Sequence, residues 1–514
     1  MRLLLVVAAA ALWFGTLGIR PLYKADESRY AEIPREMVAS GDWVTPRLNG
    51  FRYFEKPPLQ YWATATLFSV FGQRDWVARL WTALTGFAGV ALVFGFTRKI
   101  ATRRAAWCAA AVAAGSPLYV LLGQVNTLDM GLTFFLSAAL FAFALGHWLL
   151  FWAACALAVL SKGLIGIVLP LGAVALYILV KRDWALLGRM RLVKGGALFL
   201  AIAAPWFVAV SLRNPEFAHF FFIQEHFERF TTKMHGRYQP AWYFLPVLGV
   251  GLAPWLLPLF PALGKAFAKK PAFDAPLFLA LWVILVFVFF SISDSKLPSY
   301  ILPIFPALAV LLGLWLADAP RAVLLAQGAL AALAGIAVAI LAPSLAADYA
   351  GYVPWMIGAA LLAAASGIAT VAFAWRNAYG PALASLAAAG FACTQAALVG
   401  HRTLAPLFSV ASLVASAPAI PPGVPVYAVD GYDHTMPWYL RRTVTMVGYE
   451  DELEKAIAWE PAKFVRDEAR FAERWRQDPV AFAFVPVQEL DRLQKTLPMQ
   501  VLARDPRYVL VRKP

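Results

Sequence analysis

Hydrophobic residues fall in long blocks along this chain, and short polar segments separate the blocks. Most blocks are about 17–22 residues long, which is the length that an α-helix needs to cross a hydrocarbon core of about 30 Å. The pattern therefore predicts an all-α polytopic membrane protein with about thirteen spans. The short blocks between residues 130 and 180 leave open whether they are full spans or re-entrant segments. The expected spans are residues 3–19, 78–97, 105–122, 130–146, 148–160, 164–180, 195–212, 241–262, 276–292, 300–316, 322–343, 355–375 and 380–400.

Clusters of Lys and Arg between the blocks orient the predicted helices. The positive-inside rule places such clusters on the cytoplasmic side. We expect the first block to be a retained helix and not a signal peptide, because no small-residue cleavage pattern follows it. The clusters are Arg98, Lys99, Arg103 and Arg104; Lys181, Arg182, Arg189, Arg191 and Lys194; and Lys265, Lys269 and Lys270. The segments then expected on the outer side are residues 20–77, 124–129, 213–240, 293–299 and the tail from about 401.

Composition agrees with the block pattern. Of the 514 residues, 61% are hydrophobic and 15% are charged, whereas a soluble domain is about 45–50% apolar and about 25% charged. The net charge of +15 does not indicate nucleic-acid binding, because the cations are spread over short loops. Cys108, Cys155 and Cys393 lie inside apolar stretches without metal-ligand spacing, so we interpret them as small core residues.

The tail changes character at about residue 420, after a proline-rich segment. Residues 451–476 are typical of a helix that is interrupted at Pro461. We therefore expect two domains, a membrane domain over residues 1–403 and a small outer α/β domain over residues 404–514. The expected strands are Val424–Val429, Thr443–Tyr449, Ala481–Val487 and Tyr508–Val511.

The segment 20–77 is dense in charged and aromatic residues, although the topology places it outside. Tyr30, Ile33 and Met37 are spaced to share one helical face, which predicts a helix along the membrane surface; Pro34 predicts a kink or an early end. Asp26 and Arg29 are three residues apart and would face the same way on a helix. The alternative is that Asp26 is an N-cap beside a solvated arginine.

Further along, two prolines follow Lys56 and favour an extended backbone. A stiffly presented ammonium at a membrane surface suits a phosphate oxygen. The alternative is that this aromatic segment only anchors the loop among lipid headgroups. Lys162 presents a similar choice, because an ionisable residue inside a span indicates function but can also snorkel to the surface.

Two segments of the first loop resemble those of a known family. Residues Ala25-Asp-Glu-Ser-Arg-Tyr-Ala-Glu-Ile-Pro-Arg-Glu-Met37 and Phe54-Glu-Lys-Pro-Pro-Leu-Gln-Tyr-Trp62 look like the first periplasmic loop of bacterial aminoarabinose lipid A transferases. Those enzymes belong to the protein O-mannosyltransferase-like superfamily of membrane glycosyltransferases, whose fold is called GT-C. The resemblance extends over nearly the whole chain through the span layout and the outer tail domain.

The resemblance implies a role for each of several residues. Asp26 matches the essential acidic residue of the loop, Asp129 matches a second important aspartate, and Glu55 matches a metal ligand. His235 is the natural partner of Glu55 in a zinc site, with His226 as a competitor, but two ligands fall short of the four that structural zinc usually takes. The residues implied to contact the donor phosphate are Arg29, Lys56 and, in the motif Ser295-Lys-Leu-Pro-Ser-Tyr300, Tyr300.

The function implied is transfer of 4-amino-4-deoxy-L-arabinose from undecaprenyl phosphate to lipid A, at the periplasmic face of the bacterial inner membrane. The expected partners are this lipid-linked donor, lipid A or another acceptor, and membrane lipids, and the expected state is a monomer. No glycine-rich nucleotide fingerprint is present in the sequence, so we expect no nucleotide cofactor. A different sugar, or a protein or glycan acceptor, is the near alternative; a lipid or sugar transporter is the alternative from another class.

Overall fold

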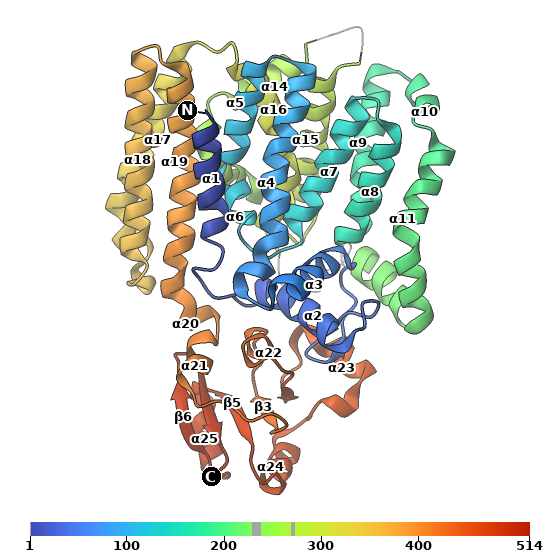
Figure 1. Cartoon of the computed structure of the whole chain (residues 1–514), viewed down its shortest axis with the longest axis vertical. Helices are drawn as coiled ribbons and strands as arrows, with labels where there is room; N and C mark the ends of the chain where they lie inside the picture. The colour runs from blue at the N-terminus through green and yellow to red at the C-terminus, as the bar shows by residue number, and fades with distance from the viewer. Residues whose placement is uncertain (1, 229–237, 269–272) are drawn as a thin grey trace. The chain divides into compact units, whose positions relative to one another are not determined.

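The computed structural model describes residues 2–228, 238–268 and 273–514 (Figure 1). The chain forms two compact units. The first, which we call the helical unit, contains Met1–Thr16, Glu55–Gln60 and Arg79–Gly400. The second, which we call the mixed unit, contains Leu17–Phe54, Tyr61–Ala78 and His401–Pro514.

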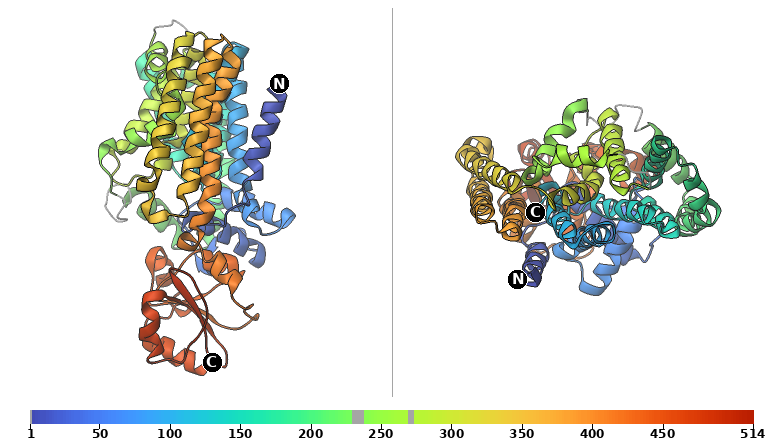
Figure 2. Two further views of the ribbon diagram at one scale, coloured as in Figure 1. Left: turned by 90° about the vertical axis from the view of Figure 1, so that its left-hand side faces the viewer. Right: turned by 90° about the horizontal axis from the view of Figure 1, so that it is seen from above.

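Long apolar helices run side by side in the helical unit (Figure 2). Within the described residues, seven are long and apolar enough to cross a membrane. They are α4 (Asp75–Ile100), α11 (Leu192–Arg213), α15 (Ala275–Ile292), the continuous η4 (Pro298–Ile304) and α16 (Phe305–Leu316), α17 (Arg321–Leu345), α18 (Val353–Trp375), and α19 (Tyr379–Gly400) with its continuation to Phe408.

Small residues let two of these helices approach closely. A Cβ atom built on Gly335 of α17 would lie 2.6 Å from the carbonyl oxygen of Ala360, and one on Gly367 of α18 would lie 2.5 Å from the nitrogen of Ala332. Neither position can carry a side chain without moving the backbones apart. Such small-residue contacts are typical of helices that associate within lipid.

Shorter apolar helices complete the bundle. They are α1 (Arg2–Gly15), α7 (Asp129–Ala144), α8 (Trp148–Lys162), α9 (Ile165–Lys181) and η2 (Ala241–Tyr243) with α13 (Phe244–Gly251). The remaining short elements of the unit are α5 (Arg103–Ala114), α6 (Pro117–Leu122), α10 (Ala185–Arg189), η1 (His219–Glu228), η3 (Ala253–Trp255), α14 (Leu259–Ala266) and η5 (Ala347–Tyr349).

Two of the expected spans are not continuous helices. Residues 105–122 divide into α5 and α6, because Pro117 supplies no N–H to continue the ladder. Residues 241–262 are likewise interrupted between α13 and α14, where Pro254 and Pro258 lie. Each of these two expected spans therefore contains more than one helix. Between residues 130 and 180 the chain forms the three separate helices α7, α8 and α9.

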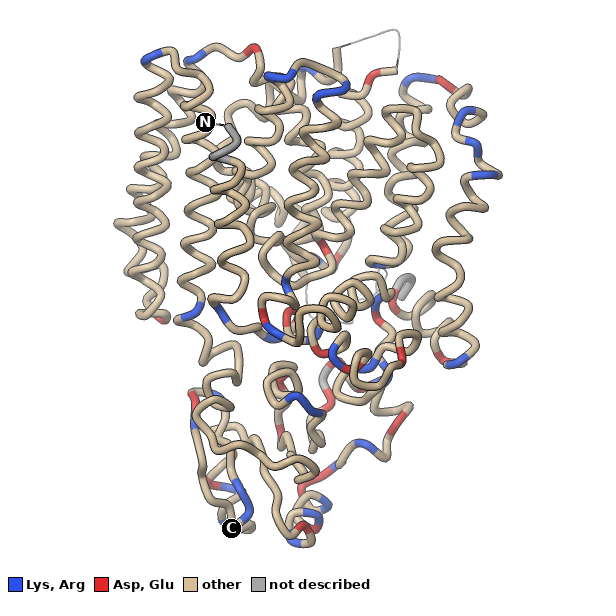
Figure 3. The backbone as a smooth tube through the Cα atoms, viewed as in Figure 1, with Lys and Arg blue, Asp and Glu red and all other residues tan. Residues whose placement is uncertain are grey.

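Within the helical unit, cations gather at one end of the helices. Arg98 and Lys99 lie in the last turn of α4, and Lys181 lies in the last turn of α9. Figure 3 shows Lys and Arg along the upper edge of this unit. By contrast, Asp129 begins α7 and Lys162 ends α8. Because α9 begins close to Lys162 and ends at Lys181, these two residues lie at the end of the helices opposite to Lys181. In the helical unit the basic clusters therefore lie at one end of the helices and the Asp129 and Lys162 side chains at the other, as the positive-inside analysis predicts.

The mixed unit is built on a five-stranded sheet with the order β4-β3-β5-β7-β6. The strand β3 is parallel to both β4 and β5, whereas β7 is antiparallel to β5 and β6. The strands are β3 (Val426–Val429), β4 (Thr445–Val447), β5 (Phe482–Pro486), β6 (Gln500–Arg504) and β7 (Tyr508–Arg512). The helices of the tail are η6 (His401–Leu404), α20 (Ala405–Phe408), α21 (Ala411–Ser416), α22 (Thr435–Leu440), η7 (Asp451–Leu453), α23 (Glu454–Trp459), η8 (Pro461–Lys463), α24 (Glu468–Gln477), η9 (Val487–Glu489) and α25 (Leu490–Gln494).

The expected tail strands are confirmed, and the sheet packs on a core that contains the buried Phe471 and Trp475 of α24. The sequence analysis missed β6, an edge strand whose residues are exposed or half-buried. It also missed α22, which is only six residues long. The helix expected over residues 451–476 is interrupted near Pro461 as predicted, but the break is wide enough for Val465 to form a bridge with Val447.

The rest of the mixed unit comes from the first loop. Helix α2 (Asp26–Ser40) packs on α22 and on β1 (Arg47–Leu48), and α3 (Leu59–Phe71) follows the hairpin that β1 makes with β2 (Phe51–Arg52). Pro34 lies inside α2, so the early end that it predicts does not occur. Most of α2 is buried, including all of its charged residues except Asp26, which differs from the surface helix that its apolar spacing predicts.

The hairpin turn is formed by Asn49 and Gly50, both with positive φ, as two-residue hairpins require. Asn49 is buried, and its side-chain amide exchanges two hydrogen bonds with the backbone of Val444. Its Nδ2 donates to the Val444 carbonyl at 2.9 Å, and its Oδ1 accepts from the Val444 N–H at 2.8 Å. One side chain thus ties the loop hairpin to the segment before β4.

We expect Asn49→Ala to destabilise the mixed unit by about 2–3 kcal/mol, because it leaves two buried backbone groups unpaired and places a Cβ-bearing alanine at positive φ. Asn49→Gly removes the backbone strain and should recover about 1 kcal/mol. Thermal unfolding of the purified protein, followed by tryptophan fluorescence, measures the effect. An unchanged unfolding temperature in Asn49→Ala would contradict this role.

Candidate functional site

A cavity of about 160 Å³ lies in the helical unit. Its lining includes four segments around residues 55–56, 129, 225 and 293–300, which the positive-inside analysis predicts to lie on one side. Apolar side chains of α9 and α15 complete the wall. Its charged or phenolic lining residues are Glu55, Lys56, Asp129, Lys162, Glu225 and Tyr300.

The antiparallel pair of α7 and α8 brings Asp129 and Lys162 together. Asp129 is the first residue of α7 and Lys162 is the last residue of α8, so two helices of nearly equal length return the chain to its starting level. The Lys162 ammonium donates to Oδ1 of Asp129. An acid at a helix N-terminus and a base at a C-terminus also match the helix dipoles. Both side chains are largely buried, so each neutralises the charge of the other.

Tyr300 lies beside this pair. It belongs to η4, and its ring centroid is 5.2 Å from the Lys162 Nζ, within the range of a cation–π contact. The ring also packs against Phe290 at 5.1 Å between centroids. Of the two interpretations left open for Lys162, the structure supports a place in the cavity rather than at the lipid surface.

Lys56 forms the second charged group of the cavity. Its Nζ donates to the Glu55 carbonyl at 2.8 Å and lies 3.3 Å from Oε2 of Glu225 and 3.7 Å from Oε2 of Glu55. The segment is fixed nearby by Gln60, whose amide donates to Asn126 at 3.0 Å. Sequence reasoning missed Glu225, which lies in the aromatic-rich helix η1 without a motif around it. Its place in an expected outer loop was the one available signal.

Carboxylates outnumber ammonium groups in the cavity lining. Glu55, Asp129 and Glu225 give three negative charges against two positive charges from Lys56 and Lys162. Among the described residues, no group of three or more His, Cys, Asp or Glu side chains could hold a metal ion. His235 and the side chain of His226 lie outside the described part of the chain. The described donors therefore do not make up a zinc site, and zinc at Glu55 and His235 stays a prediction.

Asp26 and Arg29 belong to the mixed unit, at the start of α2. The Arg29 Nη1 donates to Oδ1 of Asp26 at 3.0 Å, so the two residues share one helical face as predicted. Ala25, not Asp26, is the N-cap residue, which excludes the capping alternative. Arg29 is only 4% exposed, whereas Asp26 is 47% exposed. The buried guanidinium therefore holds a carboxylate that solvent can reach.

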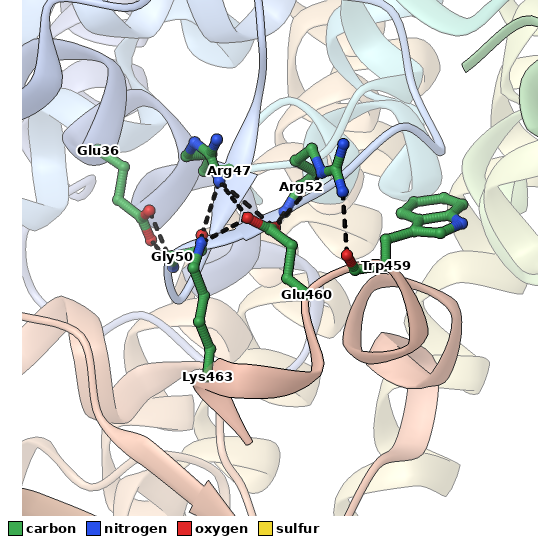
Figure 4. A network of polar contacts seen from close by, with 7 residues as sticks. All are labelled: Glu36, Arg47, Gly50, Arg52, Trp459, Glu460 and Lys463. Carbon is green, nitrogen blue, oxygen red and sulfur yellow. Dashed lines mark hydrogen bonds and ion pairs between the residues drawn. The ribbon is translucent and has the colours of Figure 1, made fainter. Parts of the chain in front are cut away.

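A polar network connects Glu36 of α2 to the loop hairpin and to the tail (Figure 4). Both carboxyl oxygens of Glu36 accept from the Gly50 N–H, at 3.0 and 3.1 Å. The Gly50 carbonyl accepts from Arg47 and Lys463, at 2.9 and 2.7 Å. Glu460 then accepts from the Lys463 ammonium at 2.6 Å and from the Arg52 N–H at 2.8 Å. This network holds the loop hairpin to the tail within the mixed unit.

Burial raises the pKa of Glu36 to about 8, and the neighbouring Glu32 adds to the rise. Burial also raises the pKa of Glu32, although Arg35 opposes it through two hydrogen bonds of 2.5 and 2.6 Å. Glu36 is thus mostly protonated near neutral pH and can donate to Glu32 one turn away.

The chain is similar to known glycosyltransferases. A family model described as dolichyl-phosphate-mannose-protein mannosyltransferase matches residues 1–221, and one described as aminoarabinose transferase C-terminal domain matches residues 411–513. The chain is 37% identical over 276 residues to an undecaprenyl phosphate-alpha-4-amino-4-deoxy-L-arabinose arabinosyl transferase of Aeromonas hydrophila, and 35% identical over 275 residues to that of Aeromonas salmonicida. Each alignment covers 51% of this chain and 50% of the relative.

A solved structure matches the whole chain. The structure of ArnT from Cupriavidus metallidurans bound to undecaprenyl phosphate superposes with a TM-score of 0.95 at 36% identity, covering 100% of this chain and 98% of that one. The apo structure of the same protein gives a TM-score of 0.92.

A bundle of apolar helices with a charged cavity at one end, joined to a small sheet-containing tail unit, defines a membrane glycosyltransferase of the GT-C class. Within that class the match over the whole chain is decisive. The chain belongs to the aminoarabinose transferase family.

The raised pKa of Glu36 makes the stability of the mixed unit depend on pH. A carboxyl whose folded pKa exceeds its unfolded value stabilises the fold below about pH 4.5, and this contribution is lost as pH rises through about 8. We expect Glu36→Gln, which is neutral at every pH, to lose less stability than the wild type between pH 6 and 9. Unfolding temperatures across that range measure the difference. Glu473→Gln on the exposed face of α24 should follow the wild-type curve; a Glu36→Gln curve parallel to the wild type would refute the assignment.

Proposed function

We propose that the protein transfers 4-amino-4-deoxy-L-arabinose from undecaprenyl phosphate to a phosphate of lipid A. The observation that carries this proposal is the cavity at the end of the bundle opposite the cationic clusters, where Lys56, Lys162 and Tyr300 gather with carboxylates. The sugar and the carrier are those of the related transferase of Aeromonas hydrophila, and the related ArnT structure contains undecaprenyl phosphate. The cationic clusters, taken as cytoplasmic, support a periplasmic site in the inner membrane. The proposed acting form is a monomer.

The reaction needs one displacement at the anomeric carbon of the sugar. The bond from this carbon to the carrier phosphate breaks, and its electrons leave with undecaprenyl phosphate. A bond from the same carbon to the acceptor phosphate forms on the opposite face, with inversion. The acceptor phosphate is already ionised, so no general base has to remove a proton. Catalysis then depends mainly on stabilising the phosphate charge that develops on the leaving side.

Each cavity residue has a proposed part in that step. Lys56 and Tyr300 bind the phosphate of the donor, as an ammonium and a phenol donate to phosphate oxygens. Lys162 orients Asp129, whose carboxylate faces the sugar and stabilises its positive charge. An incoming phosphate competes with Glu225 for Lys56.

Two further assignments come from the family resemblance. Arg29 on α2 keeps the implied role of a donor-phosphate ligand, and Asp26 that of an essential acid. Zinc at Glu55 and His235 also stays part of the proposal, with Glu55 as one carboxylate ligand.

Lipid A analysis tests the activity itself. In a strain that lacks its own enzyme, we expect the wild-type gene to add aminoarabinose to lipid A under inducing conditions, as measured by mass spectrometry. Asp26→Asn should lower transfer by at least about 100-fold, because the family resemblance implies that the charge of this carboxylate is essential to transfer. Asp491→Asn, at an exposed position of α25, serves as the matched control. Unmodified lipid A in cells that make the wild-type protein in the membrane would refute the proposal.

Lys56→Met tests the phosphate contact. Removing a charge-assisted hydrogen bond should weaken the binding of undecaprenyl phosphate by about 10- to 100-fold. Binding can be measured with the purified protein by the rise in unfolding temperature with ligand concentration. Lys495→Met, at an exposed tail position, should bind as the wild type does. Equal affinities for Lys56→Met and the wild type would remove Lys56 from the donor site.

A further inference from the structure

The tail contributes a carboxylate to the side chain of Arg29. The Arg29 Nη2 donates to Oε2 of Glu452, while its Nη1 donates to Asp26 at 3.0 Å. Glu452 lies in η7, more than 400 residues along the chain from α2. The guanidinium is therefore held from two sides, by one acid of the first loop and by one acid of the tail.

Glu452 is itself fixed by a second tail residue. The Nε2 atom of His434 lies 2.5 Å from Oε1 of Glu452, and the imidazole ring packs edge-on against Tyr432 at 4.9 Å between centroids. Burial by itself would raise the pKa of Glu452, but His434 and Arg29 hold it well below its usual range. Glu452 therefore stays ionised, as a fixed anion needs to be in order to orient a cation.

The topology of the sheet explains how these residues meet. His434 follows β3 and Glu452 follows β4, and these two strands are parallel neighbours. The carboxyl ends of adjacent parallel strands lie at the same edge of a sheet, where ligand-facing residues often gather. The edge here presents its acid and its imidazole to α2, with which α22 also packs.

The Nε–H of Arg29 is not used by either of these two carboxylates. This N–H is buried and has no hydrogen-bond partner in the part of the chain that the structure describes. A buried donor without a partner costs free energy unless a ligand satisfies it. With Nη1 and Nη2 occupied by carboxylates, the guanidinium is fixed in orientation and still has an N–H for an anionic oxygen.

We propose that Glu452, held by His434, is a positioning residue that sets the orientation of Arg29 for an oxygen of the donor phosphate. The tail is thus part of the donor-binding machinery and not only a stabilising appendage. This inference rests on the proposed role of Arg29. In this arrangement the Glu452 carboxylate fixes the Nη2 group of the guanidinium, and the Nε–H is free to donate to a phosphate oxygen.

The test uses the purified full-length protein and undecaprenyl phosphate as the probe. We expect Glu452→Gln to weaken undecaprenyl phosphate binding and to raise the donor KM by about tenfold, because the charge-assisted contact to Arg29 becomes neutral. Glu454→Gln, the exposed acid two residues further on, should stay within about twofold of wild type. His434→Ala should resemble Glu452→Gln, and His434→Gln, which keeps an N–H donor, should recover part of the affinity.

A double variant separates positioning from folding. If Glu452 acts through Arg29, Glu452→Gln should cause no further loss of affinity in an Arg29→Lys background. A purely structural role would lower the unfolding temperature and leave donor affinity unchanged, or would add to the Arg29→Lys loss; either result overturns the inference. If Arg29→Lys itself binds undecaprenyl phosphate as the wild type does, the proposed role of Arg29 fails, and the inference fails with it.

Discussion

Charge inside an apolar bundle has to be paired, and the ion pair between Asp129 and Lys162 is where the helical unit meets this constraint. The pair joins the first residue of α7 to the last residue of α8, so the antiparallel packing of two short helices and the position of the charges depend on each other. Losing either partner would leave an uncompensated charge in a largely buried cavity. The same pair supports Tyr300 and sets one wall of the cavity.

The mixed unit applies the same principle with more partners. Its α2 carries buried acidic and basic side chains that form hydrogen bonds with the hairpin and with the tail. Glu36 accepts from the Gly50 N–H of the hairpin, and Arg29 donates to Glu452 of the tail. These contacts cost desolvation free energy, so they are poor devices for stability alone. Their directional geometry is better suited to holding Asp26 and Arg29 in fixed positions.

Some features of the fold and of the site could be predicted from the sequence, and others could not. The apolar blocks predicted the long helices, and the spacing of Asp26 and Arg29 predicted their shared face. Sequence reasoning failed at two prolines. Helix α2 continues through Pro34, although proline usually ends or kinks a helix, and the length of the apolar block around Pro117 gave no sign of the break there. The edge strand β6 lacks the buried pattern on which strand prediction depends. Glu225 and Glu452 had no motif to indicate them, since their importance comes from what they contact.

The sequence by itself determined the class of protein. The length of the apolar blocks and the position of the basic clusters between them are properties of local composition, and they are enough to indicate a membrane protein. The sequence also determined which short motifs resemble those of the family. The tertiary structure alone decided the partners: that Lys162 pairs with Asp129, that Glu225 reaches Lys56, and that the tail supplies Glu452 to Arg29. Pairing between residues that lie 33 to 423 positions apart depends on how helices and parallel strands return the chain in space. Periodicity and composition, which are local, carry no information about that return.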